Sequence, residues 1–119
     1  MTASQDKLIG IVGPCGAGKT TLIKGLKESG YRLRHIAQEH SYVPYMWKRI
    51  SNPDILIFLQ VSYSVSMQRR KMNWTEDEYQ EQLRRLSHAR QHADYFLDTD
   101  NLSIQEVKER VLTFLQKGK

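Results

Sequence analysis

Apolar residues along the chain fall into short runs and alternations that predict four β-strands. Residues 7–12 and 55–61 are almost continuously apolar, a pattern typical of buried parallel strands. Residues 31–37 alternate between polar and apolar side chains, and residues 95–98 form a last short strand-like run. Because 55–61 is the longest apolar run, we expect it to lie in the centre of a sheet.

The segments between and after these strands predict helices. The expected helices cover residues 21–29, 43–50, 62–71, 75–93 and the stretch from 103 onward. Gly30 ends the first helix, and Pro44 is tolerated in the first turn of the second. The last two helices each begin with a capping box, which pairs Thr75 with Glu78 and Ser103 with Glu106.

Each of the two capped helices has one apolar face. Trp74 and Tyr79 have the spacing of a hydrophobic staple around the first cap. The side chains expected to point inward are Tyr79, Leu83, Leu86 and Ala93 in the first helix, and Ile104, Val107, Val111, Phe114 and Leu115 in the second.

The elements therefore alternate in the order β-α-β-α-β-α-α-β-α. This order predicts an α/β fold, with a mainly parallel sheet of about four strands between helices, as in a three-layer αβα sandwich. A chain of 119 residues is expected to form a single domain, 1–119. In such folds ligands bind at the carboxyl ends of the strands.

A glycine-rich motif joins the first strand to the first helix. Residues 13–20 have the sequence Gly-Pro-Cys-Gly-Ala-Gly-Lys-Thr and match G-x-x-x-x-G-K-[ST], the P-loop pattern. Its glycines let the backbone wrap an anion, and its N–H groups and the helix dipole attract phosphate. Lys19 can reach the β- and γ-phosphates, and Thr20 can bind Mg²⁺. The predicted nucleotide-binding residues are Gly13, Pro14, Cys15, Gly16, Ala17, Gly18, Lys19, Thr20 and Thr21.

Composition narrows the class of ligand and the cellular setting. The net charge of +5 suits an anionic ligand, but basic residues are interleaved with acids, which argues against a nucleic-acid-binding surface. No stretch approaches the roughly 20 apolar residues of a membrane span, and residues 1–6 lack the features of a secretory signal. Cys15 is the single cysteine, so we expect no internal disulfide and a cytoplasmic protein.

Several segments together resemble the nucleoside and nucleotide kinases among P-loop proteins, such as thymidylate, adenylate and shikimate kinases. These segments are the motif 13–20, the strand 53–61, the following Arg69–Arg70 pair and the ending 93–100 before a capped helix. The resemblance covers most of the chain, and the motif is its specific part. It implies ATP as substrate, Mg²⁺ as cofactor and transfer of the γ-phosphoryl group.

The resemblance also implies roles for residues outside the motif. Arg69 and Arg70 stand where these kinases begin a lid, whose arginines neutralise charge during phosphoryl transfer. Asp100 and Asn101 belong to a loop that would pass near the adenine. The helix that would return from the lid carries Arg84, Arg85 and Arg90.

The chain departs from these kinases at two places. The β-α unit that holds the phosphate acceptor is shortened between the second strand and residue 53, so the acceptor stays unknown. The strongest apolar strand ends in Gln60 where a Walker B motif would have an aspartate. Glu39, after the second strand, is the best substitute: it would orient Mg²⁺ or act as a base, unless it is a surface carboxylate in a turn.

Two groups of side chains leave alternatives open. His88 and His92 have a spacing that can bind a metal but lack a third ligand, which favours a solvated helix face. An aromatic cluster follows the second strand and would either line an acceptor or base pocket or pack in the core or at a dimer surface; its members are Tyr42, Tyr45, Met46 and Trp47.

Three functions follow from these patterns. The first is a small-molecule or nucleotide kinase, and the second is an ATPase whose acceptor is water, which the shortened acceptor region favours. The third is a nucleotide-sensing module without catalysis, which the missing Walker B acid favours. The absence of Asn-Lys-x-Asp argues against a Ras-type GTPase. Unpaired sheet edges leave room for a homo-oligomer.

Overall fold

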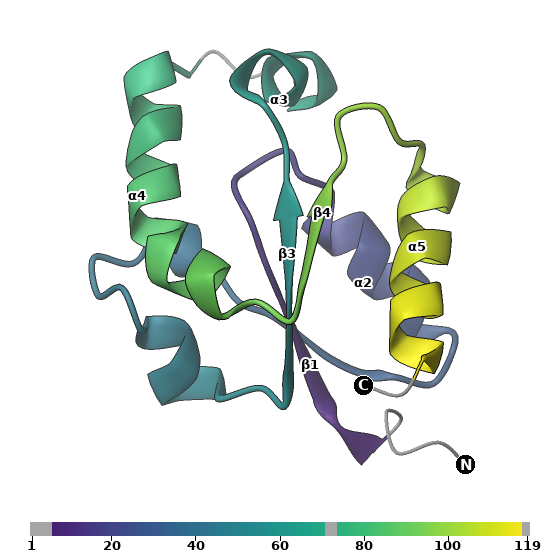
Figure 1. The fold of residues 1–119 in the computed structure, drawn as a ribbon. Coiled ribbons are helices and arrows are strands. Elements are labelled where there is room, and N and C mark those ends of the chain that lie inside the picture. The colour runs from purple at the N-terminus through teal and green to yellow at the C-terminus, as the bar shows by residue number, and fades with distance from the viewer. Residues whose placement is uncertain (1–5, 71–73, 118–119) are drawn as a thin grey trace.

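A single parallel sheet organises the fold. The computed structural model describes residues 6–70 and 74–117, and within them four strands pair in the order β2-β1-β3-β4 (Figure 1). The strands are β1 (Leu8–Val12), β2 (Arg32–His35), β3 (Ile55–Gln60) and β4 (Tyr95–Asp98). The predicted α/β class with a parallel four-stranded sheet is confirmed, although β2 is shorter than the alternation at 31–37 indicated.

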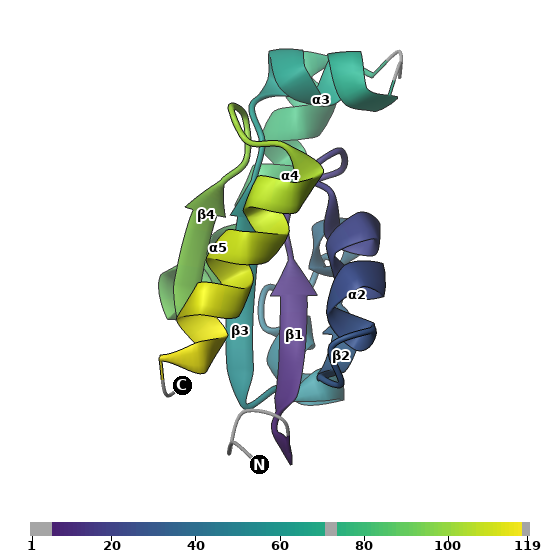
Figure 2. The same cartoon turned by 90° about the vertical axis from the view of Figure 1, so that its right-hand side faces the viewer.

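Helices cover both faces of this sheet. The helices α2 (Lys19–Lys27) and α5 (Ile104–Gln116) lie on one face, and α4 (Glu76–His92) lies on the other (Figures 1 and 2). The 3₁₀ turn η1 (Gln38–His40) and the π-helical turn η2 (Trp47–Ser51) accompany α4, whereas α3 (Tyr63–Arg70) lies beyond the carboxyl end of β3. This arrangement is compatible with a three-layer sandwich.

The two faces of β3 enter two separate hydrophobic cores. Ile57 and Leu59 pack with α2 and α5, whereas Leu56 and Phe58 pack on the side of α4. Successive side chains of a strand point to opposite faces, so a strand buried on both faces must be apolar at every position. The continuous apolar run in β3 therefore reports its central place in the sheet.

The predicted capping signals are present, although α2 runs from Lys19 to Lys27 and not over the expected 21–29. Gly30 has a φ of +88°, the left-handed conformation that a side chain disfavours, just after α2. Thr75 and Ser103 both cap their helices, and each capping box has its two reciprocal hydrogen bonds. The rings of Trp74 and Tyr79 meet edge to face with centroids 5.9 Å apart, as the staple predicted.

Three details of the helices differ from the prediction. The helix expected at 43–50 starts only at Trp47, because the Gln38 side chain accepts a hydrogen bond from the Trp47 N–H and fixes the start there. Leu83 is half-buried while its neighbour Gln82 is buried. Ile104 was expected inward but is 70% exposed at the start of α5. The expected helix end at residue 71 lies outside the described residues.

Within the described part of the chain, every helix is too short or too polar to cross a lipid bilayer.

Candidate functional site

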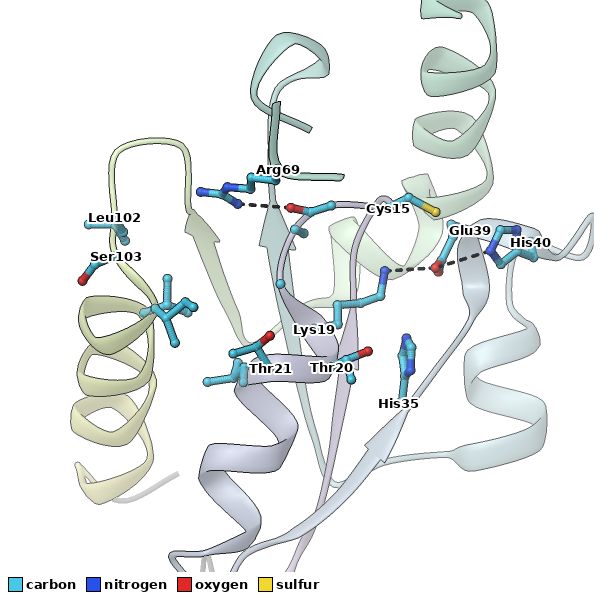
Figure 3. Close-up of a pocket in the computed structure, with 16 residues that line it drawn as sticks. Cys15, Lys19, Thr20, Thr21, His35, Glu39, His40, Arg69, Leu102 and Ser103 are labelled. Carbon is cyan, nitrogen blue, oxygen red and sulfur yellow. Dashed lines mark hydrogen bonds and ion pairs between the residues drawn. The ribbon is translucent and has the colours of Figure 1, made fainter. Parts of the chain in front are cut away.

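A cavity of about 670 Å³ opens at the carboxyl ends of the strands, where the glycine-rich loop lies (Figure 3). Residues 15–22 form one side of it, and the end of β2 with η1 forms another. The remaining wall comes from α3 and from the start of α5. The lining residues outside the loop are His35, Glu39, His40, Arg69, Leu102, Ser103, Ile104 and Val107.

The backbone of the loop depends on its glycines. A Cβ atom on Gly13 would lie 2.2 Å from the carbonyl oxygen of Leu59, so no side chain fits there. Gly16 and Gly18 have φ values of 89° and 93°, in the left-handed region. Gly18 also precedes α2, and no side chain in the described residues caps this helix. The first N–H groups of α2 are therefore free to bind an anion.

Lys19 lies buried at the base of the cavity. Its Nζ atom donates to Glu39 Oε2 at 2.9 Å, to the Pro14 carbonyl at 3.3 Å and to the Gly13 carbonyl. Lys19 and Glu39 are only 6% and 3% exposed, so Glu39 is not a surface carboxylate. The structure thus joins the lysine of the motif to the acid that the sequence offered as a Walker B substitute.

The sheet order explains why Glu39 reaches Lys19. β2 pairs directly with β1, with His35 opposite Ile11, so the turn after β2 meets the loop after β1. In that turn, Gln38 is buried and donates to the carbonyls of Val43 and Arg85, which fixes the backbone of η1. Thr20 and Thr21 are exposed in the first turn of α2 and line the cavity.

Arg69 connects three elements above the cavity. Its guanidinium donates to the Gly16 carbonyl at 3.2 Å (Figure 3). It also donates to Thr99 Oγ1 at 2.9 Å and to the Thr99 carbonyl. The side chain therefore ties α3 to the glycine-rich loop and to the loop after β4. Arg70 ends α3, but its side chain lies outside the described part of the structure.

The loop after β4 differs from the expectation. Asp100 accepts a hydrogen bond from the Ser62 N–H at 2.8 Å, and Asn101 is exposed, so neither lines the cavity. Leu102 and Ser103 lie on the wall instead. Asp100 is withdrawn because it holds the backbone at the start of α3.

The arginines of α4 also lie outside the cavity wall. Arg84 and Arg85 both pair with Glu81, at 2.6 and 3.1 Å, and the Arg90 guanidinium lies over the Phe96 ring. Arg85 reaches only the backbone of the site, where it donates to the Glu39 carbonyl at 3.4 Å. Opposite charges one turn away on the same helix explain this arrangement.

Two residues of the site were not predicted. Gln82 accepts a hydrogen bond from the Cys15 N–H at 3.0 Å and donates to its thiol at 3.3 Å, and so holds the tip of the loop. The available signal was a polar residue within the apolar spacing of Tyr79, Leu86 and Ala89. His35 ends β2 beside the cavity, where desolvation and then the Lys19 charge lower its pKa.

The aromatic cluster and the histidine pair form a separate structural unit. Trp47 is buried against α4, and its Nε1 donates to His88 Nδ1 at 3.0 Å. The rings of His88 and His92 stack with centroids 4.3 Å apart. The expected solvated face is found only in part, because His92 is exposed whereas His88 is half-buried beside Trp47. The cluster residues Tyr42, Tyr45, Met46 and Trp47 all lie outside the main cavity wall.

Protonation of His88 is expected to weaken the fold. Desolvation, His92 and Lys48 lower the pKa of His88 below 6.5, and the Trp47 N–H requires an unprotonated Nδ1. The unfolded chain then binds more protons than the folded one, so stability falls as pH drops through about 6.5. Urea unfolding at pH 7.5 and 5.5 should show a smaller loss for His88→Gln than for wild type. Equal losses would rule out this role for His88.

Comparison with known proteins adds no assignment. No protein-family model matches the chain, and a search of curated proteins finds no match.

Proposed function

We propose that this protein binds Mg-ATP in the cavity at the carboxyl ends of the strands and transfers its γ-phosphoryl group. The observation that carries the proposal is the loop 13–20 itself, with its left-handed glycines, the uncapped start of α2 and a buried Lys19 beside it. Backbone N–H groups and an ammonium group that converge at a helix start are suited to a phosphate chain. A cavity of about 670 Å³ has the size of a small-molecule site.

Lys19 would change partners when a nucleotide binds. Its ammonium group now bonds to two loop carbonyls and to Glu39. Phosphate oxygens carry more negative charge than carbonyls and would replace them as acceptors. Lys19 would then neutralise charge on the transferred group, which is the main task of a protein in phosphoryl transfer.

Thr20 and Glu39 fit the role of magnesium ligands. Mg²⁺ prefers oxygen donors, often one or two from the protein together with phosphates and water. The Thr20 hydroxyl lines the cavity, and Glu39 Oε1 is a buried carboxylate oxygen that has no hydrogen-bond partner among the described residues. The ion would supply charge neutralisation at the phosphates, while Glu39 would hold it directly or through water.

The start of α5 is suited to the base of the nucleotide. Leu102 and Ile104 form an apolar wall, and the 70% exposure of Ile104 leaves its side chain free to contact a planar ring. Arg69 also lines this cavity, and its hydrogen bonds connect the glycine-rich loop to Thr99. Contact with the base would explain why the apolar side chain of Ile104 lies outside the core.

Two candidate reactions differ in the molecule that accepts the phosphoryl group. A kinase is the first candidate, because His35 and His40 stand with Glu39 on the cavity wall and could contact an acceptor. An ATPase is the second, because the described residues between β2 and β3 form only the short turns η1 and η2. Those turns leave little chain to build a dedicated acceptor pocket.

The test is γ-phosphate transfer from Mg-ATP by the wild-type protein, alone and with pools of nucleosides, nucleotides and small hydroxyl metabolites. A phosphorylated product with one pool is the kinase result, and phosphate release to water alone is the ATPase result. Glu39→Gln should keep nucleotide binding while turnover falls at least tenfold, because it removes the candidate base or metal ligand. Binding without any turnover in wild type would contradict both reactions and leave a nucleotide sensor.

A further inference from the structure

A sulfur, a nitrogen and a carboxylate ligand converge beside the glycine-rich loop. The ligand atoms of Cys15, Glu39 and His40 all lie within 4.8 Å of one another. Cys15 comes from the loop after β1, and the other two residues come from η1 after β2. Figure 3 shows the Cys15 thiol and the His40 ring beside the Glu39 carboxylate.

We propose that these three residues form a binding site for a thiophilic divalent cation of the zinc class. Zinc binds thiolate, imidazole and carboxylate groups, whereas Mg²⁺ selects oxygen donors. A site with three protein ligands leaves a fourth position open, as in zinc sites that bind water or substrate. All three residues line the main cavity, so an incoming ligand can reach that position.

The distances fit such an ion after small side-chain rotations. Zinc bonds of about 2.0–2.3 Å place the ligand atoms of a tetrahedral site roughly 3.3–3.6 Å apart. His40 Nε2 lies 3.8 Å from Oε2 of the Glu39 carboxylate, so its ring has to turn to share an ion with the other oxygen, Oε1. The His40 side chain is 61% exposed and can rotate without repacking the core. The thiol proton would leave to solvent, because sulfur binds zinc as the thiolate.

An independent observation at Glu39 also points to a ligand. Its Oε1 atom is buried and lacks a hydrogen-bond partner among the residues that the structure describes, while Oε2 bonds to Lys19. A buried carboxylate oxygen without a partner costs free energy unless a donor or a cation reaches it. A zinc ion bound to this oxygen would satisfy it and leave the Lys19 pair in place.

The two proposed metals share Glu39 but differ in their other ligands. If the proposed ATP reaction holds, zinc would occupy the carboxylate that Mg²⁺ needs and would inhibit turnover. The zinc site itself does not rest on that reaction, because its ligands are protein atoms and need no nucleotide. It can therefore be tested on the free protein.

The test measures metal binding by tag-free, reduced protein without nucleotide. Zinc affinity comes from competition with a chromophoric chelator, and Co²⁺ serves as a spectroscopic probe. We expect one zinc per chain and a thiolate-to-cobalt charge-transfer band in the near ultraviolet. Cys15→Ser should abolish the band, and His40→Ala should weaken zinc binding at least about tenfold, because each removes one of three ligands.

Two histidines outside the cluster provide matched controls. His35→Ala removes a histidine from the same cavity, and His92→Ala removes one from the stacked pair on α4. Both should bind zinc as wild type does. Equal zinc affinity in Cys15→Ser, His40→Ala and wild type would overturn the site, provided thermal melts show that all variants fold. Loss of zinc binding in His92→Ala alone would move the metal to α4 and would also overturn it.

Discussion

Lys19→Met is expected to lower γ-phosphate transfer from Mg-ATP at least about 100-fold, the usual cost of removing a donor that faces developing negative charge. Lys19 is the buried cation at the base of the cavity, and its ammonium group already reaches the Gly13 and Pro14 carbonyls of the loop. Methionine keeps an unbranched side chain of nearly the same length but has no charged group to bind a phosphate. The measurement is phosphate release or product formation at limiting enzyme, with ATP varied up to saturation.

The same substitution leaves Glu39 buried without its counterion, which destabilises the fold. The double variant Lys19→Met/Glu39→Gln removes both charges, so its melting temperature should recover while its turnover stays below that of Glu39→Gln alone. Lys24→Ala is the matched control, because Lys24 is exposed on the same helix and lies outside the cavity wall. Recovery of stability together with turnover equal to that of Glu39→Gln in the double variant would show that Lys19 acts only on folding.

Gly13→Ala is expected to destabilise the protein by about 3 kcal/mol or more, the upper end of the range for overpacking. The new Cβ would lie 2.2 Å from the Leu59 carbonyl oxygen. The Cβ is attached directly to the backbone of residue 13, and the oxygen belongs to the backbone of the central strand β3. No side-chain rotation relieves a contact of this kind. Urea unfolding monitored by tryptophan fluorescence measures the change.

Gly25→Ala provides a contrast in the helix that follows the motif. Gly25 lies inside α2, and the atom nearest to its added Cβ is the flexible Lys108 side chain, at 3.3 Å. Because alanine favours helices, this change should be neutral or stabilise by about 0.5–1 kcal/mol. Similar stability of Gly13→Ala and wild type would show that the loop and β3 can move apart at little cost, which would contradict the close contact between Gly13 and Leu59.

Local patterns predicted most of the fold. The unbroken apolar run of β3 indicated a strand buried on both faces, and the two capping boxes located the starts of α4 and α5. Predictions failed where tertiary contacts set a helix start or the exposure of a side chain. Gln38 sets the start of η2 through a long side chain, and Ile104 is apolar yet exposed beside the cavity. Neither effect is visible in periodicity, because each depends on residues from other elements.

In the candidate site, too, the features set by local sequence were predicted and those set by contacts between distant segments were not. The loop 13–20 is local, so its spacing alone predicted a tight turn before a helix, and Glu39 could be placed beside it because neighbouring strands end at the same edge. The contacts of Cys15 with Gln82 and of Arg69 with Thr99 join distant segments, and no short motif encodes them. The hydrogen bond that His88 accepts from Trp47 was likewise not predicted, because helical spacing alone does not show which face of a helix another element covers.

Calorimetric titration of ATP into the wild-type protein, with and without Mg²⁺, tests most directly whether the cavity binds a nucleotide. We expect one nucleotide bound per chain, tighter binding with Mg²⁺, and binding weakened at least about tenfold by Lys19→Met but unchanged by Lys24→Ala. Absence of nucleotide binding to the folded wild-type protein, or equal binding by Lys19→Met, would contradict this expectation.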